Sequence, residues 1–341
     1  MPRVGWLCSY TPVEVITAVG LTPVRLLGSA DKEAAARGFL PVALCPYLKS
    51  ALGTALMGEE PLDGIVVAAC CDGLRRLADV WARYVPGFVY TLDVPRRRDE
   101  AAIAYFRGRL VALAQRLGER YGVPVSEEAL GSAIAAYNQT RRLLAVLDDL
   151  RARGIGLPAG EMQGVWERAS REALATFQPG LEELLARLQG AGDRPSAVPV
   201  VVSGNVLAPD DKRALSLIEE LGGRVVGDDL CSGTRWLAGE VDLGPDPYLA
   251  LARRYLERVP CARMLDAAER YEELVRLCRR TGARGVIYLS QKFCDTFLYD
   301  FGPLRERLQG EGIRTLLLEL DGTTATLGQS RTRVEAFLEV L

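Results

Sequence analysis

The chain has 341 residues, of which 49% are hydrophobic and 25% are charged, and its formal net charge is −2. This composition excludes a disordered or collagen-like chain, and the near-neutral charge argues against nucleic acid or an anionic membrane as the main partner. Because the chain has no histidine, Ser-His-Asp and Cys-His catalysis and histidine-ligated zinc or haem are excluded as well.

The first part of the chain alternates between strand-like and helix-like segments. Short, mostly apolar runs predict parallel strands over Val4–Cys8, Val24–Leu27, Leu40–Cys45, Gly64–Cys70 and Phe88–Asp93. Helical patterns over Val13–Val19 and Leu74–Tyr84 lie between these runs. The alternation is typical of a doubly wound parallel sheet, which we expect over residues 1–98.

The middle of the chain, residues 99–193, has a helical character. Apolar residues recur at helical spacing over Ala101–Tyr121, from Ser126 to Arg153, over Glu161–Gln178 and over Leu181–Leu188. The segment Gly154–Gly160 interrupts this pattern. We expect a helical insert here and no third sheet.

The strand and helix alternation returns after a turn-rich linker, Gly190–Ser196. Strands are predicted over Val198–Ser203, Arg224–Asp229, Gly285–Gln291 and Arg314–Leu320. Helices are predicted over Asp210–Leu221, Asp246–Arg258 and Leu265–Thr281. The expected fold is therefore α/β, with two doubly wound parallel-sheet domains of the Rossmann or flavodoxin-like kind, residues 1–98 and 194–341, around a helical insert.

The sequence carries no recognisable export or membrane signal. The N-terminus lacks a basic start followed by a long apolar run, and no apolar stretch approaches the ~20 residues needed to span a bilayer. We therefore expect a cytoplasmic protein without membrane contact. In that reducing compartment the eight cysteines are expected as ligands, reactive thiols or core residues, not as disulfides.

Most cysteines follow the predicted strands. Six of the eight fall at carboxyl ends, namely Cys8, Cys45, Cys70, Cys71, Cys231 and Cys294. Ligands of open α/β sheets bind at that edge, whereas a single cysteine there is as well explained as a small buried hydrophobe. Cys278 lies inside a predicted helix and is expected in the core, and the loop residue Cys261 is left open. Asp72 is a candidate N-cap for the helix after Cys71.

Spacing distinguishes two kinds of cysteine site. Structural zinc sites use close pairs such as C-x₂-C, and the only close pair is the adjacent Cys70-Cys71. Widely spaced thiolates can instead bind separate irons of an iron–sulfur cluster. The spacing favours a cluster assembled by the tertiary fold over zinc.

Several motifs occur in a fixed order along the chain. They are Gly5-Trp6-Leu7-Cys8-Ser9-Tyr10-Thr11-Pro12, Cys45-Pro46-Tyr47, Cys71-Asp72-Gly73, Asp228-Asp229-Leu230-Cys231-Ser232-Gly233, Lys292-Phe293-Cys294-Asp295 and Arg331-Thr332-Arg333-Val334-Glu335-Ala336-Phe337. Each motif alone is weak, but together they make the chain resemble the 2-hydroxyacyl-CoA dehydratase family, which includes benzoyl-CoA reductase-type subunits and double-cubane cluster proteins. The resemblance covers nearly the whole chain except the middle helices.

The resemblance implies a two-domain protein that works as a homodimer or with a paralogous subunit. It implies a [4Fe–4S] cluster on three cysteines, best matched here by Cys45, Cys71 and Cys294, with one iron open. An ATP-dependent iron–sulfur activator would deliver a low-potential electron for the radical dehydration of a (R)-2-hydroxyacyl-CoA. The chain lacks a G-x-x-x-x-G-K-[ST] loop, so the ATPase must be another protein.

The resemblance also leaves alternatives open. Cys8, Cys231 and one of Cys70 or Cys261 would complete a set of six, as in the branch that binds a double-cubane [8Fe–9S] cluster and reduces small molecules. A cluster-carrying electron-transfer subunit without its own catalysis is a further alternative.

Polar groups beside the cysteines are candidates for helping roles. Backbone amides at the helix starts after Cys8, Cys45 and Cys71 can hydrogen-bond sulfur. Ser9, Asp72 and Lys292 are candidates for orienting substrate or protons, although Ser9 and Asp72, each taken alone, are better explained as helix caps.

Overall fold

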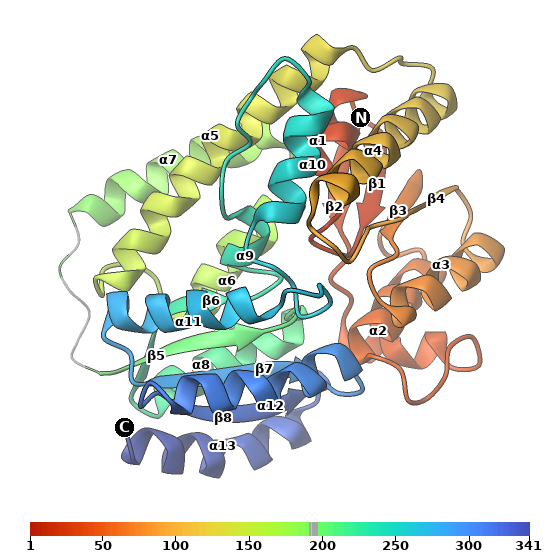
Figure 1. Ribbon diagram of the computed structural model, residues 1–341. Helices are drawn as coiled ribbons and strands as arrows, with labels where there is room; N and C mark the ends of the chain where they lie inside the picture. Colours follow the sequence, from red (N-terminus) through yellow and green to blue (C-terminus); the bar gives the residue numbers. More distant parts are fainter. Residues whose placement is uncertain (191, 193–196) are drawn as a thin grey trace.

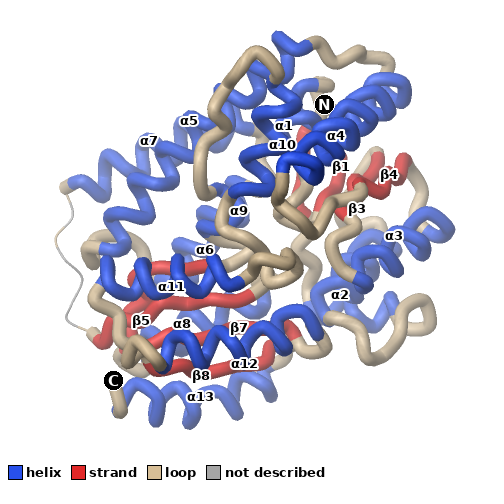
Figure 2. The backbone as a smooth tube through the Cα atoms, viewed as in Figure 1, coloured by secondary structure: helices blue, strands red, loops and turns tan. Residues whose placement is uncertain are grey.

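The computed structural model describes residues 1–190, 192 and 197–341, and it contains two four-stranded parallel sheets (Figures 1 and 2). The first sheet has the order β2-β1-β3-β4, with β1 Arg3–Trp6, β2 Thr22–Arg25, β3 Gly64–Ala68 and β4 Phe88–Leu92. The second has the order β6-β5-β7-β8, with β5 Val198–Gly204, β6 Gly223–Asp229, β7 Gly285–Gln291 and β8 Arg314–Leu320. The predicted α/β class with two doubly wound sheets is confirmed.

Helices cover the faces of the first sheet. Its neighbours in sequence are α1 Val13–Ala18, the 3₁₀ helix η1 Ala30–Ala36, α2 Pro46–Leu56 and α3 Asp72–Tyr84. Ile65 and Val67 of β3 pack in one apolar cluster with residues of α2 and α3. Val66 packs in another, with residues of α1. This alternation follows from the two-residue period of a strand, and it explains why every residue of β3 is buried.

The segment Leu40–Cys45, predicted as a strand, is a loop. Prolines limit backbone pairing at both of its ends, since neither Pro41 nor Pro46 has an N–H group to donate to a ladder. Pro46 begins α2 instead, and Cys45 is the N-cap residue of that helix. Val42 is 86% exposed, so this apolar run is not a buried strand.

The middle helices connect the two sheets. They are α4 Glu100–Tyr121, α5 Glu127–Ala152, α6 Ala159–Ala169 and α7 Leu174–Gln189. Ser126 accepts a hydrogen bond from the Ala129 N–H and caps α5, as its position predicts. The long helix α5 contacts α1 of the first unit and β6 of the second.

The helix break expected after Gln178 is wrong. The chain breaks instead between Ala169 and Leu174, and α7 continues through Pro179. Phe177, Leu181, Leu185 and Leu188 of α7 are all buried at helical spacing, so tertiary packing maintains the helix past the proline.

The second sheet has helices on both faces. The elements after β5 are the 3₁₀ helix η2 Pro209–Asp211, α8 Lys212–Glu220, α9 Thr234–Leu237, α10 Pro247–Glu257, α11 Ala268–Thr281, α12 Asp295–Gln309 and α13 Thr324–Glu339. Side chains of α11 and α12 form one core cluster with the sheet, and side chains of α8 and α13 form another. In contrast, α10 packs against α4 and α5 and shares the core of the first unit.

The predicted linker, Gly190–Ser196, falls largely outside the described residues, as does the predicted domain boundary between 193 and 194. No helix in the described part of the chain is long and apolar enough to cross a membrane.

Candidate functional site: a cluster of seven cysteines

Both sheets direct cysteine-bearing loops toward the same region. The order of each sheet places β1 beside β3 and β5 beside β7, and these central pairs are where the crossover connections diverge. Ligands of doubly wound sheets bind beyond the carboxyl ends of such strands. Cys8 follows β1, Cys70 and Cys71 follow β3, Cys231 follows β6 and Cys294 follows β7.

We name Cys45, Cys71 and Cys294 the outer thiol group. Each is the N-cap residue of a helix, α2, α3 and α12 respectively. The three thiols are close enough to act electrostatically on one another. Burial raises the pKa of Cys71 to about 12, and the backbone amide of Leu74 partly opposes this rise. The helix starts thus present N–H groups to the three sulfur atoms.

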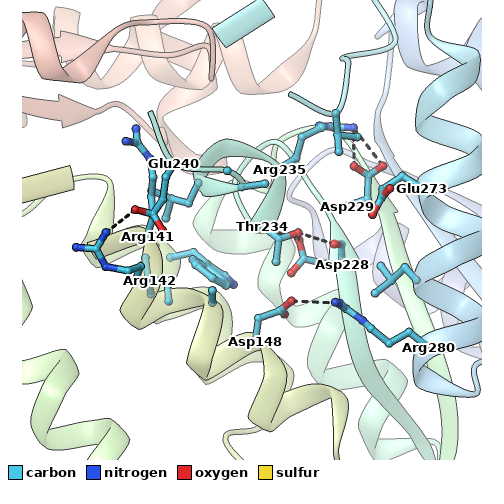
Figure 3. Close-up of a pocket in the computed structure, with 18 of the residues that line it drawn as sticks. Arg141, Arg142, Asp148, Asp228, Asp229, Thr234, Arg235, Glu240, Glu273 and Arg280 are labelled. Carbon is cyan, nitrogen blue, oxygen red and sulfur yellow. Dashed lines mark hydrogen bonds and ion pairs between the residues drawn. The ribbon is translucent and has the colours of Figure 1, made fainter. Parts of the chain in front are cut away.

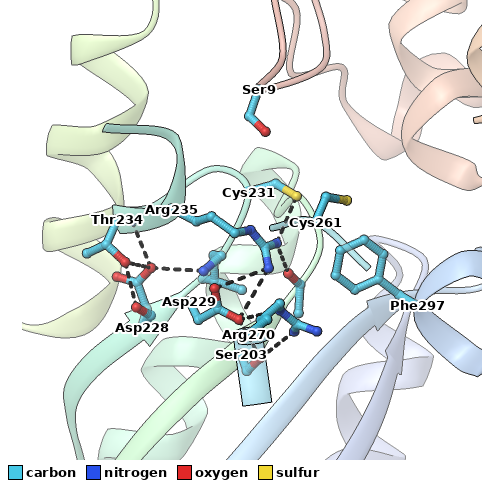
Figure 4. Close-up of polar contacts among 12 residues, drawn as sticks. Ser9, Ser203, Asp228, Asp229, Cys231, Thr234, Arg235, Cys261, Arg270 and Phe297 are labelled. Carbon is cyan, nitrogen blue, oxygen red and sulfur yellow. Dashed lines mark hydrogen bonds and ion pairs between the residues drawn. The ribbon is translucent and has the colours of Figure 1, made fainter. Parts of the chain in front are cut away.

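We name Cys8, Cys70, Cys231 and Cys261 the inner thiol group. Cys8 shares a hydrogen bond with Cys70, and Cys231 shares one with Cys261. The two pairs also act on each other, Cys8 on Cys231 and Cys70 on Cys261. Figure 4 shows the sulfur atoms of Cys231 and Cys261 side by side above Arg235.

The two groups form one connected site. Cys71 interacts with Cys8, and Cys294 interacts with Cys231, so all seven thiols belong to one network. Each of the seven is partly exposed, whereas Cys278 is 1% exposed in the core beside Leu274, as predicted. Within the described residues no three His, Cys, Asp or Glu side chains are gathered as the ligands of a single metal ion.

Buried arginines surround the inner thiol group. Arg235 Nη2 donates to the Cys231 sulfur at 3.0 Å, and Arg25 Nη1 donates to the Cys231 carbonyl at 2.9 Å. The Cys261 thiol and these two guanidinium groups hold the pKa of Cys231 well below its ordinary value, against the effect of burial. Arg258 donates to the Ser9 carbonyl at 2.7 Å. Sequence reasoning missed all three arginines, because arginine is normally a surface residue.

A buried ion-pair network holds Arg235 in its position beside Cys231. Arg270, which has no exposed surface, donates from Nε to Asp229 at 2.6 Å and from Nη2 to Ser203 at 2.8 Å, and it pairs with Asp300. Asp229 in turn accepts from Arg235 at 3.1 Å (Figure 4). The network therefore fixes the guanidinium group that contacts Cys231.

Replacing Arg270 with leucine will destabilise the protein by about 3–5 kcal/mol, because Asp300 loses its cationic partner and Asp229 keeps only Arg235. The matched control is Arg276→Leu on the same helix, where an exposed pair with Glu273 contributes about 0–1 kcal/mol. Urea unfolding followed by circular dichroism measures both. An equal loss of unfolding free energy in the two variants would show that the buried network contributes no more to stability than the exposed pair.

The three polar residues predicted to orient substrate or protons, Ser9, Asp72 and Lys292, lie in different surroundings. Ser9 is buried, and its hydroxyl accepts from Arg258 at 3.2 Å. Asp72 is the first residue of α3 and not its cap, because Cys71 takes that position, and its side chain is 78% exposed. Lys292 pairs with Asp321 at 2.5 Å. Their proposed roles toward substrate stay predictions.

A pocket of about 420 Å³ lies beyond Arg235 (Figure 3). Asp228, Asp229, Thr234 and Arg235 contribute to its wall, and no cysteine is among its described lining residues. Arg142 and Glu240 form an ion pair at this pocket, on the α5 side. The pocket and the thiol groups therefore share the Arg235 and Asp229 pair as a common wall.

Comparisons with known proteins agree with the motifs. A family model described as "2-hydroxyglutaryl-CoA dehydratase, D-component" matches residues 8–341. The putative dehydratase subunit YjiM of Escherichia coli is 28% identical over 100% of this chain and 92% of that protein. The (R)-phenyllactyl-CoA dehydratase beta subunit of Clostridium sporogenes is 25% identical over 99% and 91%, and a benzoyl-CoA reductase subunit of Thauera aromatica is 25% identical over 89% and 81%.

These relatives are components of dehydratase and reductase enzymes, and the resemblance inferred from the cysteine motifs is confirmed. With its two parallel sheets and the match across nearly all of its length, the chain belongs to the 2-hydroxyglutaryl-CoA dehydratase D-component family.

Proposed function

We propose that this protein is the iron–sulfur component of a dehydratase- or reductase-type enzyme and that both thiol groups bind iron. The observation that carries the proposal is the single network of seven thiols contributed by both sheets. Cysteine thiolates are the usual ligands of iron–sulfur clusters. The candidate ligands are Cys45, Cys71 and Cys294 in the outer group, and Cys8 and Cys231 with Cys70 or Cys261 in the inner group.

The charges around the site fit an anionic group. Arg25 and Arg258 are buried, and neither forms an ion pair with a described carboxylate. The Nε atoms of Arg25, Arg235 and Arg258 also have no hydrogen-bond partner among the described residues. A buried cation without a counter-ion is unfavourable, and thiolates bound to iron supply the missing negative charge.

The number of thiols favours the double-cubane alternative over a single [4Fe–4S] cluster. The outer group alone has the three cysteines that one site-differentiated cubane requires. The inner group would then be unexplained, although Arg25 and Arg235 lower the pKa of Cys231 as a ligand thiolate requires. We therefore place a two-part [8Fe–9S] cluster across both groups, with reduction of a small molecule as the favoured reaction and radical dehydration of a 2-hydroxyacyl-CoA as the second candidate.

When bound, the cluster supplies low-potential electrons and an iron able to bind a substrate oxygen. The protein's own residues position and protect this chemistry. Helix-start amides and Arg235 orient the sulfur atoms, and the apolar neighbours of the thiols limit access of water. Ser9, Asp72 and Lys292 are the polar groups proposed to orient substrate or protons.

Two partners are proposed, one from the names of the relatives and one from a motif that the sequence lacks. The relatives are named as subunits of dehydratases and of a reductase, so a second subunit, either another copy of this chain or a paralogue, is proposed. The sequence has no phosphate-binding loop, so an ATP-dependent iron–sulfur activator is proposed as the electron donor. The eight free cysteines fit the reducing cytoplasm.

Iron and acid-labile sulfide analysis of anaerobically purified and reconstituted protein tests the proposal. Two cubanes predict about eight irons per chain and a single cubane about four, numbers set by the cluster types. Electron paramagnetic resonance of the reduced protein identifies the cluster as a second readout. A protein that binds no iron after anaerobic reconstitution would refute the proposed function.

A further inference from the structure

The two thiol groups differ in the charges that surround them. Arg235 contacts the Cys231 sulfur, and Arg25 acts on both Cys231 and Cys8. In the outer group, the influences that favour the thiolates of Cys45 and Cys294 come from uncharged groups, backbone amides and the Asn205 side chain. Cys71 differs, because the Arg263 guanidinium, which donates to the Cys70 carbonyl at 2.6 Å, also lowers its pKa. With Arg25 and Arg235, more of the positive charge lies on the inner side of the site.

All seven thiols are partly exposed, but residues next to them in the sequence differ in exposure between the two groups. Beside the outer group, Val42 is 86% exposed and Phe293 is 48% exposed. Beside the inner group, Leu7, Tyr10 and Leu230 are each 1% exposed. The exposed residues beside the outer group therefore make it the more accessible side for an electron donor at the surface.

Of the two arginines that lower the pKa of Cys231, Arg25 is the one without a described carboxylate partner. It is 1% exposed at the end of β2, donates to the Cys231 carbonyl and lies 4.8 Å from the centre of the Trp6 ring. Arg235 shares its charge with Asp229, whereas Arg25 has no described carboxylate partner. Its full positive charge therefore acts on the inner thiols through a poorly polarisable interior.

We propose that Arg25, together with Arg235, makes the irons bound by the inner thiol group the final acceptor of a transferred electron. The irons bound by the outer thiol group receive that electron first from the donor. The inference rests on the proposed function. One electron leaves an iron–sulfur donor, which is oxidised by one electron, and the irons at the inner group are reduced by one electron without bond cleavage. A nearby cation stabilises the added negative charge and makes the reduction potential of that half less negative.

The test is an anaerobic redox titration followed by electron paramagnetic resonance, with iron content measured on each sample. Arg25→Met removes the charge and will shift one reduction step to a more negative potential, while Arg25→Lys will restore it toward the wild-type value. Arg254→Met is the matched control. Arg254 is also buried and donates to the Trp236 and Ala238 carbonyls, but it contacts no described thiol, so its removal will leave both steps unchanged.

A second comparison does not depend on folding of the Arg25 variants. Iron retained by Cys45→Ser should be reduced at a less negative potential than iron retained by Cys231→Ser, and the reverse order would overturn the inference. An iron-replete Arg25→Met protein with unchanged reduction steps would overturn it while leaving the proposed function intact. Wild-type protein without iron would refute the proposed function and this inference together.

Discussion

Replacing Cys45, Cys71 or Cys294 with serine will lower the iron content of the anaerobically purified protein by about half, from about eight irons to about four. Each substitution removes one thiolate from the outer group, and a serine hydroxyl is a much weaker ligand for iron than a thiolate. The inner group retains its four thiols and its arginine partners, so it should keep the remaining iron. Iron and sulfide assays on each variant measure the effect.

Cys278→Ser is the matched control for these variants. Cys278 is the remaining cysteine of the eight, buried in α11 and packed with Leu274 and Val275. The substitution changes the same atom without touching the network of seven thiols, so iron content should stay at the wild-type level. Loss of iron in this control equal to that in Cys45→Ser would contradict the assignment.

The same iron assay will decide whether Cys70 or Cys261 is the third ligand of the inner group. Cys70 pairs with Cys8, and Cys261 pairs with Cys231. If six thiolates hold the cluster, only one of Cys70→Ser and Cys261→Ser will lose iron. Full iron in both variants would reduce the inner group to Cys8 and Cys231 and would favour a single cubane on the outer group.

The second large effect is complete dependence on a partner. Cluster potentials extend to about −700 mV, below the range of mild reductants. We expect no turnover of 2-hydroxyacyl-CoA thioesters or small reducible substrates by the isolated protein with such reductants. Addition of a cognate iron–sulfur ATPase, ATP and Mg²⁺ should start the reaction, and omission of ATP should abolish it.

A chemical bypass provides the control for this prediction. A strong reductant such as titanium(III) citrate should reduce the isolated protein without ATP, as electron paramagnetic resonance would record. Full turnover by the isolated chain with a mild reductant would contradict the account, since it would indicate a conventional redox enzyme or hydro-lyase.

The strands were predictable because parallel sheets bury both faces. Continuous apolar runs marked β3 and β7, whose residues are all buried. The strand predicted over Leu40–Cys45 was wrong, because apolar composition alone cannot distinguish a buried strand from a loop between prolines. The helix end predicted before Pro179 was also wrong, because the packing of α7 maintains the helix past this proline.

The cysteines were predictable as a set, but their grouping was not. Strand ends converge in a doubly wound fold, so Cys8, Cys71 and Cys294 could be placed at one edge from sequence alone. Cys261 lies in a loop between α10 and α11, and only tertiary structure brings it beside Cys231. The arginines carry no sequence signal, because their burial depends on partners distant in the chain, such as Arg25 and Cys231.

The central claim is that iron binds to both thiol groups, and an iron anomalous-difference map from anaerobically grown crystals tests it most directly. The account predicts iron peaks among Cys45, Cys71 and Cys294 and further iron peaks beside Cys8, Cys231 and one of Cys70 or Cys261. Peaks at the outer group alone would restrict the protein to a single cubane. A map of iron-reconstituted protein without iron at either thiol group would contradict the account.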